Sequence, residues 1–275
     1  METIAFIGGG NMAGAIIGGL VGAGHPGERI VVVEPGAARR QVLIDTFGVR
    51  ASAVADVTLA DATLVIWAVK PQMFAVAAAP CRAHVGPALH LSVMAGIRSD
   101  AIARTVVSER IVRAMPNTPA LIGQGIAGLF ARPAVTESDR RRVEAVLAAT
   151  GQTLWVDGEA ALDAVTALSG SGPAYVFHLV EAMLEAARLM GLPDDAARRL
   201  AVQTVAGSAA LVAASSESPA VLRRNVTSPN GTTQAALEVF EARGVKAAVV
   251  EAILAARDRA VTLGDELGQG ADAAG

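Results

Sequence analysis

A glycine-rich segment near the N-terminus has the residue types and spacing that a pyrophosphate group requires. Gly8, Gly10 and Ala13 fit the pattern G-x-G-x-x-A, and Asn11 and Met12 open the helix expected after it. Small residues allow a tight turn close to a ligand, and the unpaired amides and dipole of a helix N-terminus favour negative charge. Such turns also occur for packing reasons, but here an apolar strand precedes the glycines and a helical pattern follows. The segment predicts a dinucleotide-binding site.

A second expected strand ends in an acid, Glu34, and two arginines follow it, Arg39 and Arg40. An acid at this position accepts a hydrogen bond from a ribose 2′-hydroxyl and repels a 2′-phosphate, which favours NADH over NADPH. The arginines could instead hold that phosphate, or they could form a solvated helix face. The residues therefore predict a cofactor that is NADPH or NADH, with Glu34 and Arg39 among its binding residues.

Two further segments follow expected strands, at the edge where ligands bind in open α/β sheets. The first is Ala68, Val69, Lys70 and Pro71, and the second holds Asn117 between two prolines. Lys70 either faces the cofactor or caps the strand end. The rigidly held Asn117 suits a polar contact to a carboxamide, or a purely structural turn. We assign all five residues to the candidate cofactor site.

The spacing of apolar residues predicts the elements that position these groups. Strands are expected over Ile4–Ile7, Ile30–Glu34, Leu64–Val69, Leu89–Met94, Ile111–Met115 and Leu154–Asp157, with helices over Met12–Val21, Ala37–Phe47, Met73–Arg82, Asp100–Val107 and Glu137–Ala149. This alternation is typical of a parallel α/β sheet. Later helices are expected over Pro173–Met190, Asp194–Ser215, Pro219–Asn225, Thr232–Glu241 and Val245–Gly264. We therefore predict an α/β domain over residues 1–160 and an all-α domain over residues 161–275.

Composition argues against several functional classes. The formal net charge is −3, with 2 Trp and 1 Tyr, so neither a basic stripe nor a stacking surface for nucleic acid is expected. Hydrophobic residues make up 52% of the chain, but no run reaches the roughly 18 apolar residues of a membrane helix. A buried subunit interface is the better explanation of this excess.

Cysteine and histidine usage points to a cytoplasmic protein without a metal. The single cysteine, Cys81, excludes an internal disulfide framework and is typical of a reducing compartment. The four histidines show no metal-ligand spacing. The N-terminal residues carry no pattern of a targeting segment.

Six segments resemble pyrroline-5-carboxylate reductases in their order and spacing. They are Phe6–Ala13, Val69–Gln72, Ala95–Ile97, Arg113–Ala120, Ala167–Tyr175 and Arg224–Leu237. The last is the most specific signature of the family, and the resemblance covers nearly the whole chain. Asn230 stands where the family usually has glycine, and asparagine is the residue that best replaces glycine in a left-handed backbone.

This resemblance implies a Rossmann-type N-terminal domain followed by an all-α C-terminal dimerisation domain that interleaves with a partner subunit. It implies a homodimer, often built into a homodecamer. The implied reaction is the reduction of the imino acid 1-pyrroline-5-carboxylate to L-proline, the last step of proline biosynthesis. The family usually uses NADPH, which differs from the preference that Glu34 suggests.

Two expected helix starts in the second half have residue types that suit the carboxylate of such a substrate. In the first, Ser171 can cap the helix and Gly172 and Pro173 lie in its first turn. The second is the tight loop formed by Ser228, Asn230, Gly231, Thr232 and Thr233. Amides and hydroxyls there could hold an anion, although ordinary helix caps have the same composition. By resemblance, Thr233 is the catalytic residue, a hydrogen-bond partner of the ring nitrogen directly or through water.

Three other functions share part of this pattern. A reductase of a related cyclic imino acid is not separable from sequence. A dehydrogenase of the 3-hydroxyisobutyrate type would need a catalytic lysine in its second domain, where Lys246 is the only lysine and lies away from every motif. A nucleotide-sensing protein without catalysis would bind the dinucleotide but turn over no imino acid.

Overall fold

The computed structural model describes residues 2–272, with side chains described up to Leu267. The chain forms two compact units. The first comprises the chain up to Ser171 together with the residues from Ala256 onward, and the second is Gly172–Ala255. Among the described residues, the first unit contains every strand of the sheet, and the second is built from helices.

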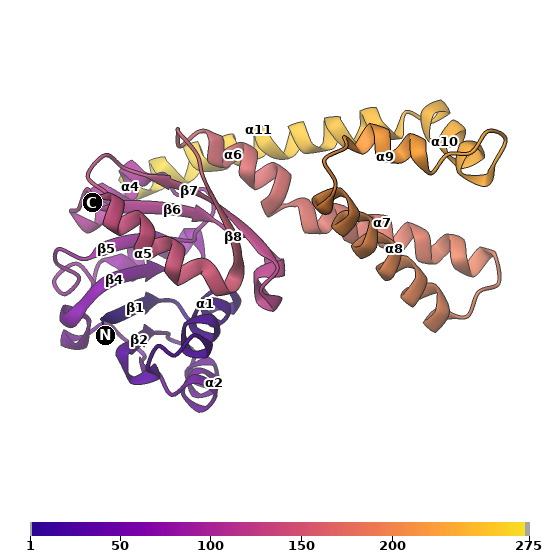
Figure 1. The fold of residues 1–275 in the computed structure, drawn as a ribbon. Helices are drawn as coiled ribbons and strands as arrows, with labels where there is room; N and C mark the ends of the chain where they lie inside the picture. Colours follow the sequence, from indigo (N-terminus) through magenta and orange to yellow (C-terminus); the bar gives the residue numbers. More distant parts are fainter. Residues whose placement is uncertain (1, 273–275) are drawn as a thin grey trace. The chain divides into compact units, whose positions relative to one another are not determined.

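An eight-stranded sheet forms the centre of the first unit, in the order β3-β2-β1-β4-β5-β6-β7-β8 (Figure 1). The strands are β1 (Thr3–Ile7), β2 (Ile30–Val33), β3 (Arg50–Ser52), β4 (Ala62–Trp67), β5 (Leu89–Ser92), β6 (Ile111–Met115), β7 (Gly125–Ala131) and β8 (Gly151–Trp155). From β3 to β6 the strands are parallel, whereas β7 is antiparallel to β6. The chain reverses its direction of winding at β1, next to β4, which is the Rossmann-type arrangement.

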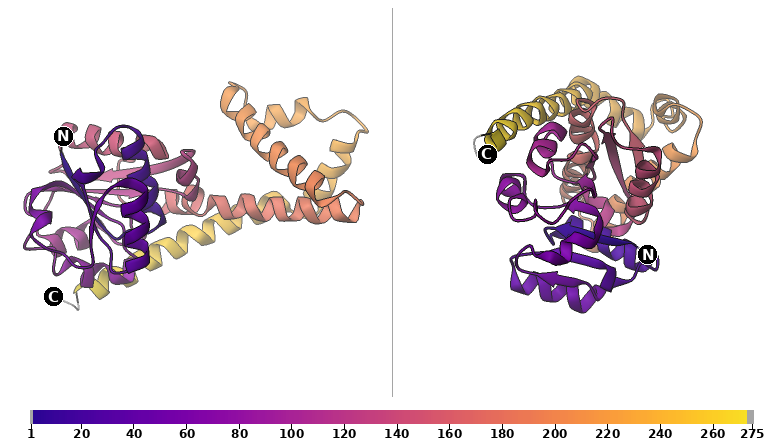
Figure 2. Two further views of the ribbon diagram at one scale, coloured as in Figure 1. Left: turned by 90° about the horizontal axis from the view of Figure 1, so that it is seen from below. Right: turned by 90° about the vertical axis from the view of Figure 1, so that its left-hand side faces the viewer.

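Helices cover both faces of this sheet (Figures 1 and 2). Those of the first unit are α1 (Asn11–Gly22), α2 (Ala37–Phe47), α3 (Phe74–Ala78), α4 (Ser99–Val106), α5 (Glu137–Leu147) and α6 (Ala161–Val165). Short 3₁₀ helices are η1 (Gly27–Arg29), η2 (Val57–Asp61), η3 (Pro71–Met73), η4 (Thr118–Ile122) and η5 (Ala148–Thr150), and a π-helix is η6 (Thr166–Gly170).

Each face of the sheet has its own hydrophobic cluster. Phe6 belongs to the face covered by α1, α2 and α5, and its neighbour Ala5 to the face covered by α3 and α4. All five residues of β1 are buried because helices lie on both sides, which explains its continuous apolar run. Burying a side chain such as Phe6 stabilises the fold by roughly 1.5–3 kcal/mol.

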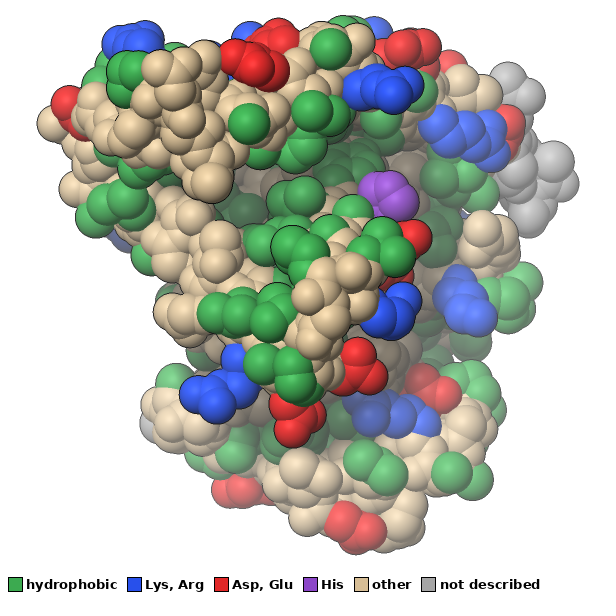
Figure 3. Space-filling model, turned by 90° about the vertical axis from the view of Figure 1, so that its right-hand side faces the viewer, with side chains coloured by type: hydrophobic (Ala, Val, Ile, Leu, Met, Phe, Trp, Pro, Cys, Tyr) green, Lys and Arg blue, Asp and Glu red, His purple; other side chains and the backbone are tan. Residues whose placement is uncertain are grey.

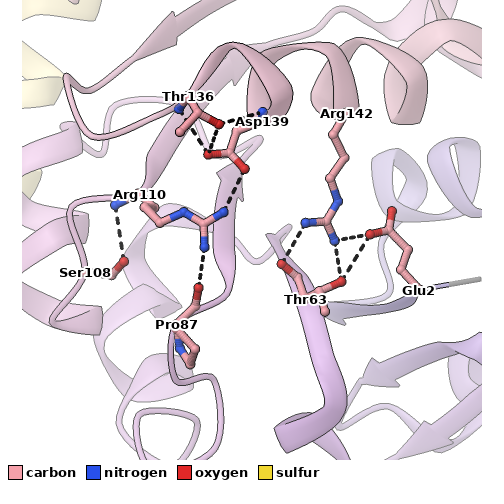
Figure 4. Close-up of polar contacts among 8 residues, drawn as sticks. All are labelled: Glu2, Thr63, Pro87, Ser108, Arg110, Thr136, Asp139 and Arg142. Carbon is pink, nitrogen blue, oxygen red and sulfur yellow. Dashed lines mark hydrogen bonds and ion pairs between the residues drawn. The ribbon is translucent and has the colours of Figure 1, made fainter.

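Polar contacts fix α5 to the sheet (Figure 4). Thr136 caps α5 by accepting the N–H of Asp139 at 3.1 Å, and Asp139 accepts the Thr136 N–H at 3.1 Å. Arg110 donates to Asp139 at 2.7 Å. Burial raises the pKa of Asp139, but hydrogen bonds from Arg110 and Thr136 outweigh it and hold that pKa below its usual value. Arg142 donates to the Thr63 carbonyl at 3.0 Å, so α5 is also tied to β4.

The sheet differs from the sequence prediction in two strands. β3 and β7 were not expected, and the antiparallel β7 makes the sheet mixed. β3 has three partly exposed residues, too few for a recognisable apolar run. Gly125 and Gly128 lower the strand propensity of β7, so the pattern did not predict it. Both glycines are needed for packing, since a Cβ on Gly128, for example, would lie 2.7 Å from Val165.

The first unit extends past the domain boundary expected at residue 160. Leu162 and Asp163 of α6 are buried, and Asp163 pairs with Arg98 at 3.0 Å. The far end of α11 (Val245–Asp272) also belongs to this unit, where Leu263 and Leu267 lie against Gly96. The compact units therefore divide at Ser171 and again within α11.

The second unit is all-α, as predicted. Its helices are α7 (Gly172–Leu189), α8 (Asp194–Ala214), α9 (Pro219–Asn225), α10 (Thr232–Ala242) and the first part of α11. In these helices the buried residues are small, namely Ala187, Ala197 and Ala201, whereas Phe177 and Phe240 are exposed. Figure 3 shows hydrophobic side chains among the polar ones on one face of the molecule. Among the described residues, no helix is both long and apolar enough to cross a membrane.

Candidate functional site

The glycine turn joins β1 to α1 at the carboxyl end of the sheet. Gly8 has a φ of 98°, and its N–H donates to the Val33 carbonyl at 2.8 Å. A Cβ on Gly8 would lie 2.6 Å from the Ala68 carbonyl oxygen, so only glycine fits between the two strand ends. Gly10 is the N-cap of α1 and provides no side-chain cap, so the first helix amides are available to an anion.

Glu34 holds this turn against the start of α2. Its Oε2 accepts the N–H of Gly9 at 2.8 Å, and its Oε1 accepts the N–H of Gly36 at 2.8 Å. Gly36 is the N-cap of α2. The predicted cofactor residue Glu34 is therefore also a structural link between two helix starts.

Both arginines bind backbone carbonyls of the same region. Arg39 donates to the carbonyls of Gly9 at 2.5 Å and Gly10 at 3.1 Å. Arg40 donates to the Glu34 and Pro35 carbonyls, each at 2.7 Å. The guanidinium groups thus stabilise both turns.

A cavity of about 480 Å³ opens beside the glycine turn. Its lining is Ile7, Gly8, Gly10, Val33, Glu34, Pro35, Ala53, Val54, Ala55, Ala68, Val69, Lys70, Met73, Val76, Ala77 and Pro80. Six predicted cofactor residues therefore meet at one cavity. Sequence reasoning missed the apolar wall that includes Val54, Met73 and Val76. Val54 follows the short β3, which was not expected, and Met73 and Val76 lie in a segment whose pattern suggested only helix packing. This wall suits a flat heterocycle such as adenine.

The remaining cofactor candidates lie around the cavity rather than in its lining. Ala13 is buried beneath the turn, Asn11 is exposed at the start of α1, and Met12 packs against the core. Pro71 opens η3 after Lys70. Asn117 accepts the Ile126 N–H through Oδ1 at 3.0 Å, which leaves its Nδ2 group as a directed donor.

In the second unit, the loop before α10 has the geometry expected of an anion site. Asn230 has a φ of 59°, which confirms its left-handed backbone. Its N–H donates to Gln234 at 2.8 Å, and the Gly231 N–H donates to the Ser228 carbonyl at 3.0 Å. Gly231 is the N-cap of α10 without a side-chain cap, so the amides of Thr232 and Thr233 open the helix.

The helix predicted from Pro173 is present as α7, but the N-cap predicted at Ser171 is wrong. Ser171 has helical φ and ψ of −84° and −19°, and its N–H donates to the Thr166 carbonyl at 2.8 Å. The chain runs from α6 through the π-helix η6 into α7, so Gly172 follows an existing helix instead of a cap. The residue types of a cap are present, but packing of α6 on the sheet begins the helix earlier.

Comparisons with known proteins match both halves of the chain. Residues 159–263 match the family model described as pyrroline-5-carboxylate reductase dimerisation, and residues 3–96 match that of NADP oxidoreductases, coenzyme F420-dependent. The pyrroline-5-carboxylate reductase of Pseudomonas aeruginosa is 44% identical, over 97% of this chain and 98% of its own. The chain belongs to the pyrroline-5-carboxylate reductase family. The predicted resemblance is thereby confirmed.

Solved structures of the family share the fold. The pyrroline-5-carboxylate reductase of Coxiella burnetii has a TM-score of 0.88 at 35% identity, covering 95% of this chain and 98% of that one. The Plasmodium falciparum enzyme, solved with NADP bound, has a TM-score of 0.86 at 26% identity, covering 96% and 98%. Both support the Rossmann-type domain and the helical dimerisation domain predicted from sequence.

Proposed function

We propose that the protein reduces 1-pyrroline-5-carboxylate to L-proline, with NADPH or NADH as the hydride donor. The observation that carries this proposal is the glycine turn with its adjoining cavity, in a chain that aligns with the Pseudomonas aeruginosa reductase over 97% of its length. The first unit would bind the cofactor, and the helical second unit would form the dimer and bind substrate.

Residues in and around the cavity suit the separate parts of the dinucleotide. The amides at the start of α1 would hold the pyrophosphate, the wall around Val54 and Met73 would take adenine, and Glu34 would accept a hydrogen bond from a ribose hydroxyl. When bound, the cofactor supplies a hydride to the ring carbon of the C=N bond. Lys70 lies in the cavity lining, and Asn117 offers its Nδ2 group to the carboxamide.

The loop before α10 is proposed to hold the substrate. The amides of Thr232 and Thr233 and the Ser228 hydroxyl suit its carboxylate, as does the helix dipole. The ring carbon of a protonated imine accepts hydride far more readily than that of a neutral imine, so a group must donate a hydrogen bond or a proton to the ring nitrogen. We assign Thr233 that role, alone or through water, with Ser171, Gly172, Asn230 and Gly231 shaping the site.

Self-association follows from the exposed apolar residues of the helical unit. Few of its side chains are buried within one chain, so the unit needs a partner to cover residues such as Phe177. We propose a homodimer, with a homodecamer as the larger assembly that a mass measurement would distinguish.

Burial raises the pKa of the Cys81 thiol to about 11, which fits an inert packed cysteine. A cysteine kept as a free thiol is consistent with the cytoplasmic location that we propose.

One assay tests the reaction. Nicotinamide absorbance is followed with pyrroline-5-carboxylate, with the six-membered homologue as a parallel substrate, and with each cofactor. Faster oxidation with the five-membered substrate and formation of proline are expected. If neither imino acid causes oxidation of the cofactor, the proposal is refuted. If the six-membered homologue is reduced faster, the protein is instead a reductase of the related cyclic imine.

A further inference from the structure

The turn between β2 and α2 forms one wall of the cavity. Glu34 and Pro35 line the cavity, and Gly36 begins α2 immediately afterwards. In Rossmann-type folds this turn meets the 2′ position of the adenosine ribose. A 2′-phosphate bound here would draw on the amides and dipole at the start of α2.

The Glu34 carboxylate already occupies that helix start. Oε1 accepts the Gly36 N–H, and Oε2 accepts the N–H of the buried Gly9 in the glycine turn. Turning the side chain aside would leave the buried Gly9 N–H without its acceptor, which is unfavourable. The negative charge is therefore held in place at the rim of the cavity.

The two arginines that could compensate this charge are engaged elsewhere. Arg39 spans the carbonyls of Gly9 and Gly10, and its guanidinium packs so closely on α1 that a Cβ on Gly14 would lie 2.6 Å from it. Arg40 binds the two carbonyls of the β2–α2 turn. Neither arginine is among the described residues that line the cavity.

We infer that the site selects NADH over NADPH, and that Glu34 is the specificity-determining residue. This inference rests on the proposed function. The fixed carboxylate accepts a hydrogen bond from a 2′-hydroxyl, whereas a 2′-phosphate in the same place meets a like charge. The Plasmodium falciparum relative was solved with NADP, so the selectivity follows from the β2–α2 turn of this chain and not from family likeness.

Direct binding tests this selectivity without turnover. Calorimetric titration compares NADH with NADPH, and adenosine 5′-diphosphate with its 2′-phosphorylated form, so that the second pair isolates the ribose. The wild-type protein is expected to bind each unphosphorylated ligand about tenfold more tightly or better, since a like charge at contact distance opposes the phosphate. Glu34→Gln should reduce both ratios to near one, mainly by tightening the phosphorylated ligands.

Two controls separate charge at the turn from other effects. Glu28→Gln removes an exposed acid at the opposite end of β2 and should leave both ratios unchanged. Arg40→Ala should change binding of the two ligands of each pair equally, because Arg40 braces the turn. A thermal unfolding midpoint for each variant checks that it remains folded.

The outcomes are distinct. Equal or tighter binding of the 2′-phosphorylated ligands by the wild type overturns the selectivity but leaves the proposed reductase intact. Affinity ratios that stay unchanged in the Glu34→Gln variant would also overturn the selectivity. Failure of every dinucleotide to bind would refute both the selectivity and the proposed function.

Discussion

Arg113 and Glu159 form an ion pair with an N–O distance of 2.8 Å that joins β6 to the segment before α6. Glu159 also accepts the N–H and the hydroxyl of Ser99, each at 2.6 Å, and so caps α4. The Arg113 side chain is 5% exposed and that of Glu159 is 20% exposed. One carboxylate thus joins β6 and the start of α4 to the segment before α6.

Removing Glu159 should therefore destabilise the first unit. Glu159→Ala leaves Arg113 buried without its partner, and we expect a loss of about 3 kcal/mol in the free energy of unfolding, measured by urea denaturation. Glu109→Ala is the matched control, because Glu109 pairs with Arg132 but is 63% exposed, and it should cost less than about 1 kcal/mol. Equal losses in the two variants would show that the buried pair stabilises the fold no more than the exposed pair does.

Stability should fall as the pH is lowered through the range of His90. His90 is buried in β5 and accepts a hydrogen bond from the Trp67 indole at 3.1 Å. Burial lowers the pKa of His90 to about 4. Between pH 6.5 and 4 the unfolded chain binds a proton there and the folded chain does not, so this contribution is complete above pH 6.5 and declines toward pH 4.

The decline attributable to His90 is roughly 3 kcal/mol as an upper figure. Urea unfolding at a series of pH values measures it. His90→Gln should lower stability at neutral pH and flatten the slope between pH 6.5 and 4, whereas His84→Asn should leave the slope in place. An unchanged slope in His90→Gln would assign the effect to other groups.

A methyl group on Gly14 should weaken cofactor binding. A Cβ there would lie 2.6 Å from the Arg39 guanidinium, which must then leave the carbonyls of Gly9 and Gly10. We expect a several-fold rise in the dissociation constant for NADH despite a gain in helix propensity of up to about 1 kcal/mol. Gly22→Ala in the same helix meets no atom within 4 Å and should bind normally. Normal binding by Gly14→Ala would show that the position of Arg39 is unimportant.

Loss of the Thr233 hydroxyl should slow turnover but spare the cofactor. If Thr233 assists protonation of the ring nitrogen, Thr233→Ala lowers kcat about a hundredfold, while the dissociation constant for NADH stays the same. Thr262→Ala removes a hydroxyl that only donates to the Asp258 carbonyl and serves as control. Unaltered kcat in Thr233→Ala would remove this residue from the chemistry.

A charge on the apolar face of the helical unit should prevent self-association. Phe177 is 62% exposed within one chain, and burying a glutamate in its place across an interface is strongly unfavourable. Light scattering should show Phe177→Glu as a monomer, with little reductase activity. Val57→Glu, at a similarly exposed position in the first unit, should keep the assembly of the wild type. An assembled Phe177→Glu protein would place the interface elsewhere.

The local sequence pattern was enough to predict elements whose apolar periodicity is strong and whose turns have recognisable residues. Buried parallel strands read as continuous apolar runs, so β1, β2 and β4 were expected close to their observed bounds, as was the glycine turn between β1 and α1. β7 escaped because Gly125 and Gly128 lower its strand propensity. Gly125 is required by the nearby backbone of Ala120 in η4, and Gly128 by the side chain of Val165 in α6. Both neighbours belong to other elements, so only the tertiary structure explains these glycines.

By itself, the amino-acid sequence determined the family, the two-part fold and the residues of the glycine turn, because strand period, small-residue spacing and signature segments are local properties. The tertiary structure alone decided that Ser171 continues a helix instead of capping one, since α6 packs on the sheet before it. It also decided what Glu34 does. Its two oxygens meet the amides of Gly9 and Gly36, and such a bridge between separate turns depends on how the chain folds back on itself.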